Sequence, residues 1–195
     1  MKNIKVLIVI SLAFMMIACG GAEERKAAYM EKAEKSLNAG DLDKARIELK
    51  NVLQIDPKDA QAYFNLGNIF ERKKDFRKAF GNYSKAAELD PDNSEYQAKI
   101  GRFYLVLAGD IEKATEKMEL ILSKDKNDIN GLILKAGISL KQGKASDAKE
   151  ITRKLFEDHP ENVESALLLA SLYARNKEYS DAIAVLDEAV KLNPG

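Results

Sequence analysis

The sequence predicts an all-α protein, an α-solenoid of about five helix–turn–helix repeats that follow an N-terminal signal segment. The first observation is composition: the 195 residues are 46% hydrophobic and include only four Pro and no Trp. Such a chain, rich in Ala, Leu, Lys and Glu, favours helices. The second observation is an internal period of 34 residues, which is typical of stacked helical units. Together they predict helices throughout the region after the signal segment.

The charge balance and residue counts exclude several classes of protein. Lys+Arg and Asp+Glu both number 31, so the basic excess of a dedicated nucleic-acid binder is absent. One Cys cannot form an internal disulfide or a cysteine-rich zinc site, and one His leaves little for a histidine-based metal site. We therefore expect no nucleic-acid partner, no metal and no cofactor.

Residues 1–18 have the features of a secretory signal peptide. Lys2 and Lys5 form a basic start, and an apolar run over 6–17 follows, interrupted only by Ser11. This run is shorter than the ~20 apolar residues that a membrane-spanning helix needs. A basic start before a short apolar core is the usual pattern of an export signal.

The end of this apolar run, Met16-Ile17-Ala18-Cys19-Gly20, resembles the lipobox of bacterial lipoproteins, with Met16 where Leu is usual. The resemblance implies cleavage between Ala18 and Cys19 and acylation of Cys19, followed by a short linker over 19–25. Lipid chains would then hold the protein on a membrane, since stable anchoring needs more than one chain. Gly20, rather than Asp, implies the outer membrane, with the protein facing the periplasm.

The repeat is visible in aligned columns of small residues. Asp56-Pro57 recurs as Asp90-Pro91, 34 residues later, and the third unit has one extra residue near Gly109. Small side chains let two helices approach closely, and a bulkier residue there would overpack the crossing. The two clearest columns are Ala45, Ala79, Ala114, Ala148 and Ala182, and Ala33, Gly67, Gly101, Ala136 and Ala170.

This pattern resembles the tetratricopeptide repeat (TPR), a 34-residue helix–turn–helix unit. The resemblance covers 26–195 and implies a non-catalytic scaffold whose concave groove, lined by the first helix of each repeat, holds a protein or peptide partner. We find no catalytic constellation: His159 occupies a helix-end slot before a Pro. The expected repeats are 26–59, 60–93, 94–128, 129–162 and 163–195.

Candidate groove residues come from the first helices of the second and third repeats. Asn65 and Asn68 are suited to hydrogen bonding with an extended peptide backbone, and Lys99 and Arg102 to pairing with a carboxylate. Polar groove residues are also often merely solvated. The candidate set is Phe64, Asn65, Asn68, Lys99 and Arg102.

The last repeat is followed by no polar capping helix in this sequence. Val185 and Val190 fall at positions predicted to form an uncovered apolar edge. Three interpretations remain open for this edge: continuation in a longer parent chain, a partner, or self-association through the C-terminal repeat.

The combined prediction is a membrane-tethered TPR scaffold in the bacterial cell envelope. A lipobox followed by TPR units resembles the TPR lipoproteins of exopolysaccharide export and exosortase (PEP-CTERM) sorting systems. Two alternatives stay open: a type IV pilus pilotin-like assembly lipoprotein, and an uncleaved, membrane-anchored TPR regulator. Tethering would raise the local concentration of whatever the groove holds.

Overall fold

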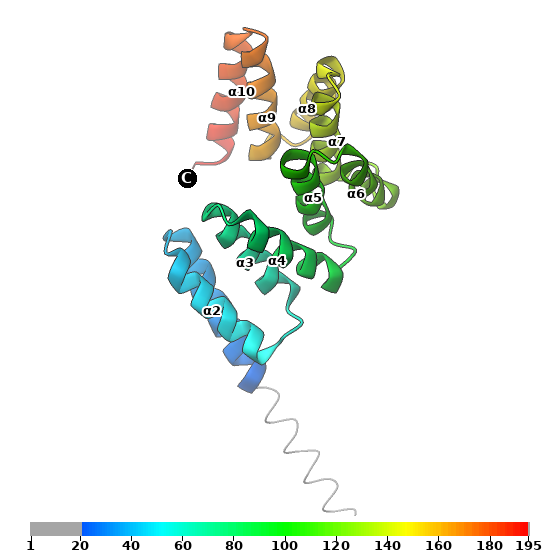
Figure 1. The fold of residues 1–195 in the computed structure, drawn as a ribbon. Coiled ribbons are helices and arrows are strands. Elements are labelled where there is room, and N and C mark those ends of the chain that lie inside the picture. The colour runs from blue at the N-terminus through cyan, green and yellow to red at the C-terminus, as the bar shows by residue number, and fades with distance from the viewer. Residues whose placement is uncertain (1–20, 195) are drawn as a thin grey trace, which may run out of the picture. The chain divides into compact units, whose positions relative to one another are not determined.

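The computed structural model describes residues 21–194, and every regular element within that range is helical. The predicted signal peptide, with Ala18 and Cys19, lies outside the described residues. The all-α prediction is confirmed (Figure 1). Residues 21–38 form a first helical segment, and it is followed by α2 (Leu42–Ile55), α3 (Ala60–Arg72), α4 (Phe76–Leu89), α5 (Ser94–Phe103), η1 (Tyr104–Ala108), α6 (Ile111–Lys124), α7 (Ile129–Lys141), α8 (Ala145–Asp158), α9 (Val163–Arg175) and α10 (Tyr179–Leu192).

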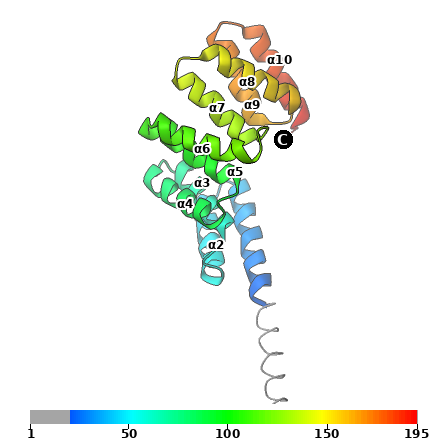
Figure 2. The same ribbon diagram turned by 90° about the vertical axis from the view of Figure 1, so that its right-hand side faces the viewer.

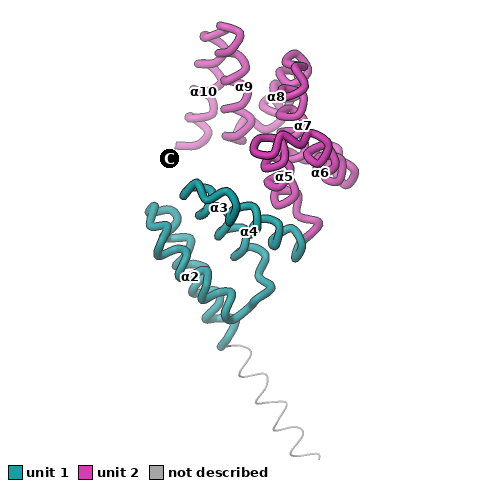
Figure 3. Tube along the Cα trace, viewed as in Figure 1, with its two compact units in different colours: residues 1–90 teal, residues 91–195 magenta. Residues whose placement is uncertain are grey.

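The chain divides into two compact units, Met1–Asp90 and Pro91–Gly195, coloured separately in Figure 3. In the described part of the first unit, the segment 21–38 packs with α2, and α3 packs with α4. Apolar residues of three consecutive helices form one shared core, because each amphipathic helix must bury its apolar face on a neighbour. The fully or nearly fully buried members are Ala33, Ala45, Leu49, Val52, Ala62, Leu66 and Ile69.

The second unit consists of three helix pairs, α5–α6, α7–α8 and α9–α10, and each pair also contacts the next (Figure 2). Its interior is made of successive small cores. Leu134 of α7 packs with Leu105 of η1 and Ala114 of α6. Leu172 of α9 packs on α7 and α8, and Phe156 of α8 packs among Ala166, Leu169 and Ala170 of α9. Each repeat therefore contributes to the core of its neighbour.

Aspartate and asparagine begin most of the helices. The side chain of each N-cap residue accepts a hydrogen bond from the backbone N–H three residues later, which satisfies one of the free donors at the helix start. The residues that do so are Asp41, Asp59, Asp75, Asn93, Asp110, Asp128 and Asn162.

One residue in the turn inside each repeat has a left-handed backbone. In alignment, this position holds Gly40, Lys74, Gly109, Gly143 and Lys177, and all five have positive φ. Glycine adopts this conformation without steric cost, whereas the two lysines do so against the Cβ clash that disfavours it. The turn geometry is therefore common to all repeats even where the residue type is not.

The extra residue of the third repeat is absorbed at the end of its first helix. Tyr104–Ala108 form a π-helical turn, closed by a hydrogen bond from the Gly109 N–H to the Tyr104 carbonyl, and Gly109 has φ 68°. The Asp110 N–H donates to the same carbonyl at 2.9 Å. A π turn accommodates one additional residue without breaking the helix. Val106 and Leu107 of this turn are exposed.

Candidate partner-binding groove

In the first unit, the candidate residues lie together on α3, but they are engaged within the unit. Phe64 is only 4% exposed, and its ring lies 5.4 Å from that of Tyr83. Asn65 is also buried; it accepts a hydrogen bond from Gln61 at 3.1 Å and donates one to the Met30 sulfur at 3.9 Å. Phe64 is therefore a packing residue, and a partner has little access to Asn65.

Asn68 belongs to a polar cluster around a buried tyrosine. The Tyr83 hydroxyl lies 2.7 Å from the Asn68 Oδ1 and 2.6 Å from the Glu71 Oε2. A hydroxyl has one hydrogen to donate, so both acceptors cannot receive it at once. Since Tyr83 is fully buried, these contacts satisfy its polar end and fix the Asn68 side chain at the edge of the α3 face.

In the second unit, Arg102 of α5 forms an ion pair with Glu164 of α9. These helices are the first helices of the third and fifth repeats, so the pair joins repeats that are not adjacent along the stack. Stacked helix pairs bring such helices together on their concave side. Arg102 and Glu164 therefore mark the inner face of the second unit.

The Arg102 guanidinium is not fully satisfied by this pair. Its Nε is shielded from solvent and has no hydrogen-bond acceptor among residues 21–194. An unpaired buried donor is costly, about 1–3 kcal/mol. Lys99 precedes Arg102 by three residues, so the two lie on the same side of α5.

Glu164 was not among the residues predicted from the sequence. The sequence does show Glu164 as an acidic residue near the start of the first helix of the fifth repeat, two repeats after the basic candidate Arg102. Periodicity predicts which helices line the inner face, but it does not give their curvature, and the curvature brings Arg102 and Glu164 together.

The apolar edge predicted at the last helix is present, but its composition differs. Val185 is buried against α9, because it faces the partner helix of its own repeat, whereas Val190 is exposed. The exposed stripe of α10 runs along one side of the helix at spacings of four, three and four residues. It consists of Tyr179, Ile183, Leu186 and Val190, which are between 37% and 69% exposed.

The corresponding face of α8 shows what this stripe would normally contact. Leu186 and Val190 align with Thr152 and Phe156, and both of these are buried, Phe156 among residues of α9. Nothing within residues 21–194 covers the α10 stripe in the same way. No helix in that range is long and apolar enough to cross a membrane, and no acidic, His or Cys cluster there is arranged to hold a metal ion.

Antiparallel helix pairs of about 34 residues, stacked on one another within each unit, define a helical-repeat protein of the interaction-scaffold class. The chain belongs to the tetratricopeptide-repeat family. The family model described as "Cytochrome c-type biogenesis protein H TPR domain" matches residues 21–155, and the model described as "Tetratricopeptide repeat" matches residues 139–195. These matches agree with the resemblance found in the sequence.

Similar proteins span several biological settings. The chain is 39% identical over 91 residues to the BBSome complex member BBS4 of Bos taurus, covering 47% of this chain and 17% of BBS4. It is 26% identical over 167 residues to the type IV pilus assembly protein PilF of Pseudomonas aeruginosa, covering 83% of this chain and 65% of PilF. The chain therefore spans less than two thirds of the length of either protein.

A solved structure of the Pseudomonas aeruginosa PilF protein has a similar fold. It superimposes with a TM-score of 0.67 at 23% identity, covering 89% of this chain and 78% of that one. Identity at this level supports the shared helical-repeat architecture alone.

Proposed function

We propose that this protein is a membrane-tethered scaffold of the bacterial cell envelope that holds a protein or peptide partner on the inner face of its first helices. The observation that carries the proposal is the Arg102–Glu164 pair, because it puts a partly exposed cation on that face. A carboxylate or a backbone carbonyl of a partner has the chemistry to engage Arg102.

The tether is proposed at Cys19, with cleavage after Ala18 and with the protein facing the periplasm from the outer membrane. The support is the lipobox resemblance in the sequence. The intact mass of the membrane-extracted protein tests it. We expect a wild-type mass that lacks residues 1–18 and includes acyl chains. The Cys19→Ala variant should show neither change. A full-length, unmodified mass would instead indicate an uncleaved, membrane-anchored regulator.

Site-specific photocrosslinking in cells tests the groove. A photoreactive residue at Lys99, on α5, should give a discrete adduct with a partner protein. The same residue at Glu116, which is exposed on the second helix of that repeat, is the matched control and should give none. Equal adducts from both positions, or none from Lys99, would count against an inner-face partner.

A pilotin-like assembly lipoprotein is the second candidate, favoured by the similarity to the type IV pilus assembly protein PilF over 83% of this chain. An exopolysaccharide export or protein-sorting role rests on the arrangement of the lipobox and repeats alone. Co-purification with a secretin would favour the pilotin-like role. An adduct from Lys99 with a component of exopolysaccharide export would favour the other.

We also propose that the exposed stripe on α10 mediates self-association. Leu186 and Val190 are apolar at positions whose counterparts on α8 are covered by another helix. The first helical segment offers no matching apolar face for a head-to-tail contact. It presents Glu31 and Lys35, which are paired at 2.6 Å and largely exposed. A symmetric contact between two α10 stripes avoids burying those charges.

A further inference from the structure

Two of the turns between repeats have the same hydrogen-bonded geometry. One joins α2 to α3 and contains Asp56 and Asp59; the other joins α6 to α7 and contains Asp125 and Asp128. In each turn the second Asp donates its N–H to the carbonyl of the first, and the Oδ1 atom of each Asp accepts a backbone N–H. In the first turn, the hydrogen bonds are Asp59 N–H to Asp56 O at 3.2 Å, Lys58 N–H to Asp56 Oδ1 at 3.0 Å and Ala62 N–H to Asp59 Oδ1 at 2.8 Å. In the second turn, they are Asp128 N–H to Asp125 O at 3.0 Å, Asn127 N–H to Asp125 Oδ1 at 2.9 Å and Gly131 N–H to Asp128 Oδ1 at 2.8 Å.

In the first of these turns, the remaining carboxylate oxygens hold an ammonium group. The Lys26 Nζ lies 3.0 Å from the Asp56 Oδ2 and 3.7 Å from the Asp59 Oδ2. The Lys26 ammonium holds the pKa of Asp56 below its usual range, and the carboxylates of Asp56 and Glu23 raise the pKa of Lys26. The paired aspartates are thus a cation-binding arrangement that this protein already uses.

The second turn has the same two aspartates but no lysine, and it has Pro91 where the first repeat has Glu23, whose Oε2 lies 3.2 Å from the Lys26 Nζ. The residue that aligns with Lys26 is Ser94, whose hydroxyl accepts a hydrogen bond from Asn130 at 3.2 Å. Within residues 21–194, Asp125 and Asp128 form side-chain hydrogen bonds with backbone N–H groups only. The other repeats do not share this combination: they carry Asp90 with Asn93, and His159 with Asn162, at the aspartate positions.

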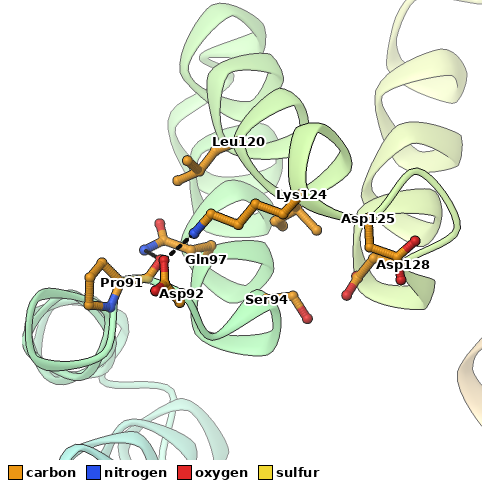
Figure 4. Close-up of a pocket in the computed structure, with 9 residues that line it drawn as sticks. Pro91, Asp92, Ser94, Gln97, Leu120, Lys124, Asp125 and Asp128 are labelled. Carbon is orange, nitrogen blue, oxygen red and sulfur yellow. Dashed lines mark hydrogen bonds and ion pairs between the residues drawn. The ribbon is translucent and has the colours of Figure 1, made fainter.

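A cavity of about 180 Å³ lies beside these carboxylates, and Ser94, Asp125 and Asp128 are among its lining residues. Figure 4 shows that Lys124 extends toward Asp92, with which it forms an ion pair, and away from Asp125 and Asp128. Lys124, which also lines this cavity, therefore pairs with neither Asp125 nor Asp128.

Two further residues give the cavity an apolar wall. Leu120 is partly exposed and Ile121 is buried, and both come from the last turns of α6. An alkyl chain that enters beside them would cover apolar surface while its charged end reaches the carboxylates, as long lysine side chains commonly do. The cavity lining thus combines carboxylates with an apolar wall.

We propose that this cavity binds a lysine side chain of a protein partner, with the ammonium between Asp125 and Asp128 in the place that Lys26 occupies in the first repeat. As with Lys26, a charge-assisted hydrogen bond to one free Oδ2 atom and an ion pair with the other hold the ammonium, and Leu120 contacts the methylene chain. The site lies on the turns between repeats, not among the groove residues of α3 and α5. It therefore does not depend on the proposed groove function.

Backbone NMR of the isotopically labelled full chain, in nonionic detergent, tests the site directly. The amides of Asn127 and Gly131 donate to Asp125 and Asp128, so their chemical shifts report on a cation at these carboxylates. Titration with Nα-acetyl-lysine N-methylamide should shift both amides saturably. The norleucine analogue, which has an alkyl chain but no ammonium, should leave them in place.

Two variants complete the test. Ser94→Lys supplies the missing ammonium from the chain itself and should abolish the response to the lysine probe. Asp128→Asn keeps the helix N-cap, since Asn caps as well as Asp, but removes one charge. It should weaken probe binding about two- to fivefold, as expected for one exposed charge pair.

Three outcomes would overturn the proposal. The first is an unsaturable shift with the lysine probe, and the second is an unchanged response in both variants. The third is an equal response to methylammonium chloride at matched concentration, which would assign the site to any small amine rather than to a lysine side chain.

Discussion

The aromatic ring of Tyr83 occupies the space directly above the Gly67 Cα, where any larger residue would place a Cβ. A Cβ added to Gly67 would come within 2.5 Å of both the Cδ1 and Cε1 atoms of Tyr83. Tyr83 cannot retreat easily, because it is fully buried and its hydroxyl is held by Asn68 and Glu71. This contact sets how closely α3 and α4 cross.

Gly67→Ala should therefore lower the free energy of unfolding by about 1–3 kcal/mol through overpacking, despite the better helix propensity of alanine. Gly81→Ala is the matched control. Gly81 lies in α4, and a Cβ added there would meet nothing within 4 Å, so the same change should raise stability by about 0.5–1 kcal/mol. Urea unfolding measures both, and equal effects would refute the steric explanation.

The left-handed turn position predicts a second pair of opposite effects. Lys74 has φ 60° where the fourth repeat has Gly143 at φ 79°. Lys74→Gly should stabilise the protein by about 0.5–1 kcal/mol by removing the Cβ clash, and Gly143→Lys should destabilise it by a similar amount. Thermal unfolding compares the two. A loss of stability in Lys74→Gly would mean that the lysine side chain makes a contact that outweighs its backbone strain.

The all-α repeat architecture was predictable from the sequence because its signal is periodic. Aligned small residues such as Ala79 and Gly67 recur wherever two helices cross, and the crossing needs them in every repeat. The extra residue of the third repeat was also visible as a change in spacing near Gly109. Its conformation was not, since a π turn and a longer loop accommodate the same insertion.

The candidate site was less predictable, because its geometry depends on contacts between residues far apart in sequence. Periodicity assigned Phe64 to an inner face, but its ring is buried against Tyr83. Arg102 lies on a first helix, where the period puts it, whereas its partner Glu164 follows 62 residues later and depends on curvature. Alignment of the repeats shows Ser94 where the first repeat has Lys26. That Lys26 pairs with the aspartates of the turn could be learned only from the structure.

The Lys26 contacts predict a specific pH dependence. The pKa of Asp56 is lowered in the folded state, so its stabilising effect is present above the unfolded value of about 3.9 and is lost as pH falls below it. The pKa of Lys26 is raised, so its stabilising effect is present below about 10.4 and is lost as pH rises through the raised value. The pair therefore stabilises the fold between these limits.

Lys26→Met should thus destabilise the protein at pH 7, by less than about 1 kcal/mol because the groups are partly solvated. The difference from the wild type should shrink at a pH below about 3.9, where Asp56 is protonated in the unfolded chain. Lys50→Met, at an exposed position on α2, is the control. Denaturant unfolding at both pH values measures the effect, and a pH-independent difference would contradict the ion-pair origin.

Self-association through α10 predicts a concentration-dependent dimer. Ile183→Glu or Val190→Glu places a charge in the exposed stripe and should abolish the dimer, since burying an unpaired charge is costly. Ala184→Glu adds the same charge at an exposed position on the polar side of α10 and should have little effect. Sedimentation equilibrium distinguishes the variants. A wild type that stays monomeric over the whole accessible concentration range would contradict the proposal.

The Arg102–Glu164 pair allows structural and partner-binding roles to be separated. Arg102→Glu and Glu164→Arg each place like charges together, so each should lower stability, by less than about 1 kcal/mol at this partly exposed site. The double variant Arg102→Glu/Glu164→Arg restores an ion pair of reversed polarity and should recover most of that loss. Chemical unfolding of all three variants measures this coupling.

Partner binding should not recover in the same way, because the cation then lies on α9 instead of α5. If Arg102 engages a partner carboxylate or carbonyl, photocrosslinking from Lys99 should remain weak in the double variant even though its stability is restored. Recovery of both stability and crosslinking would show that the pair only holds the second unit in shape. Loss of crosslinking in the double variant, at a stability equal to that of the wild type, would identify Arg102 as a group that contacts the partner.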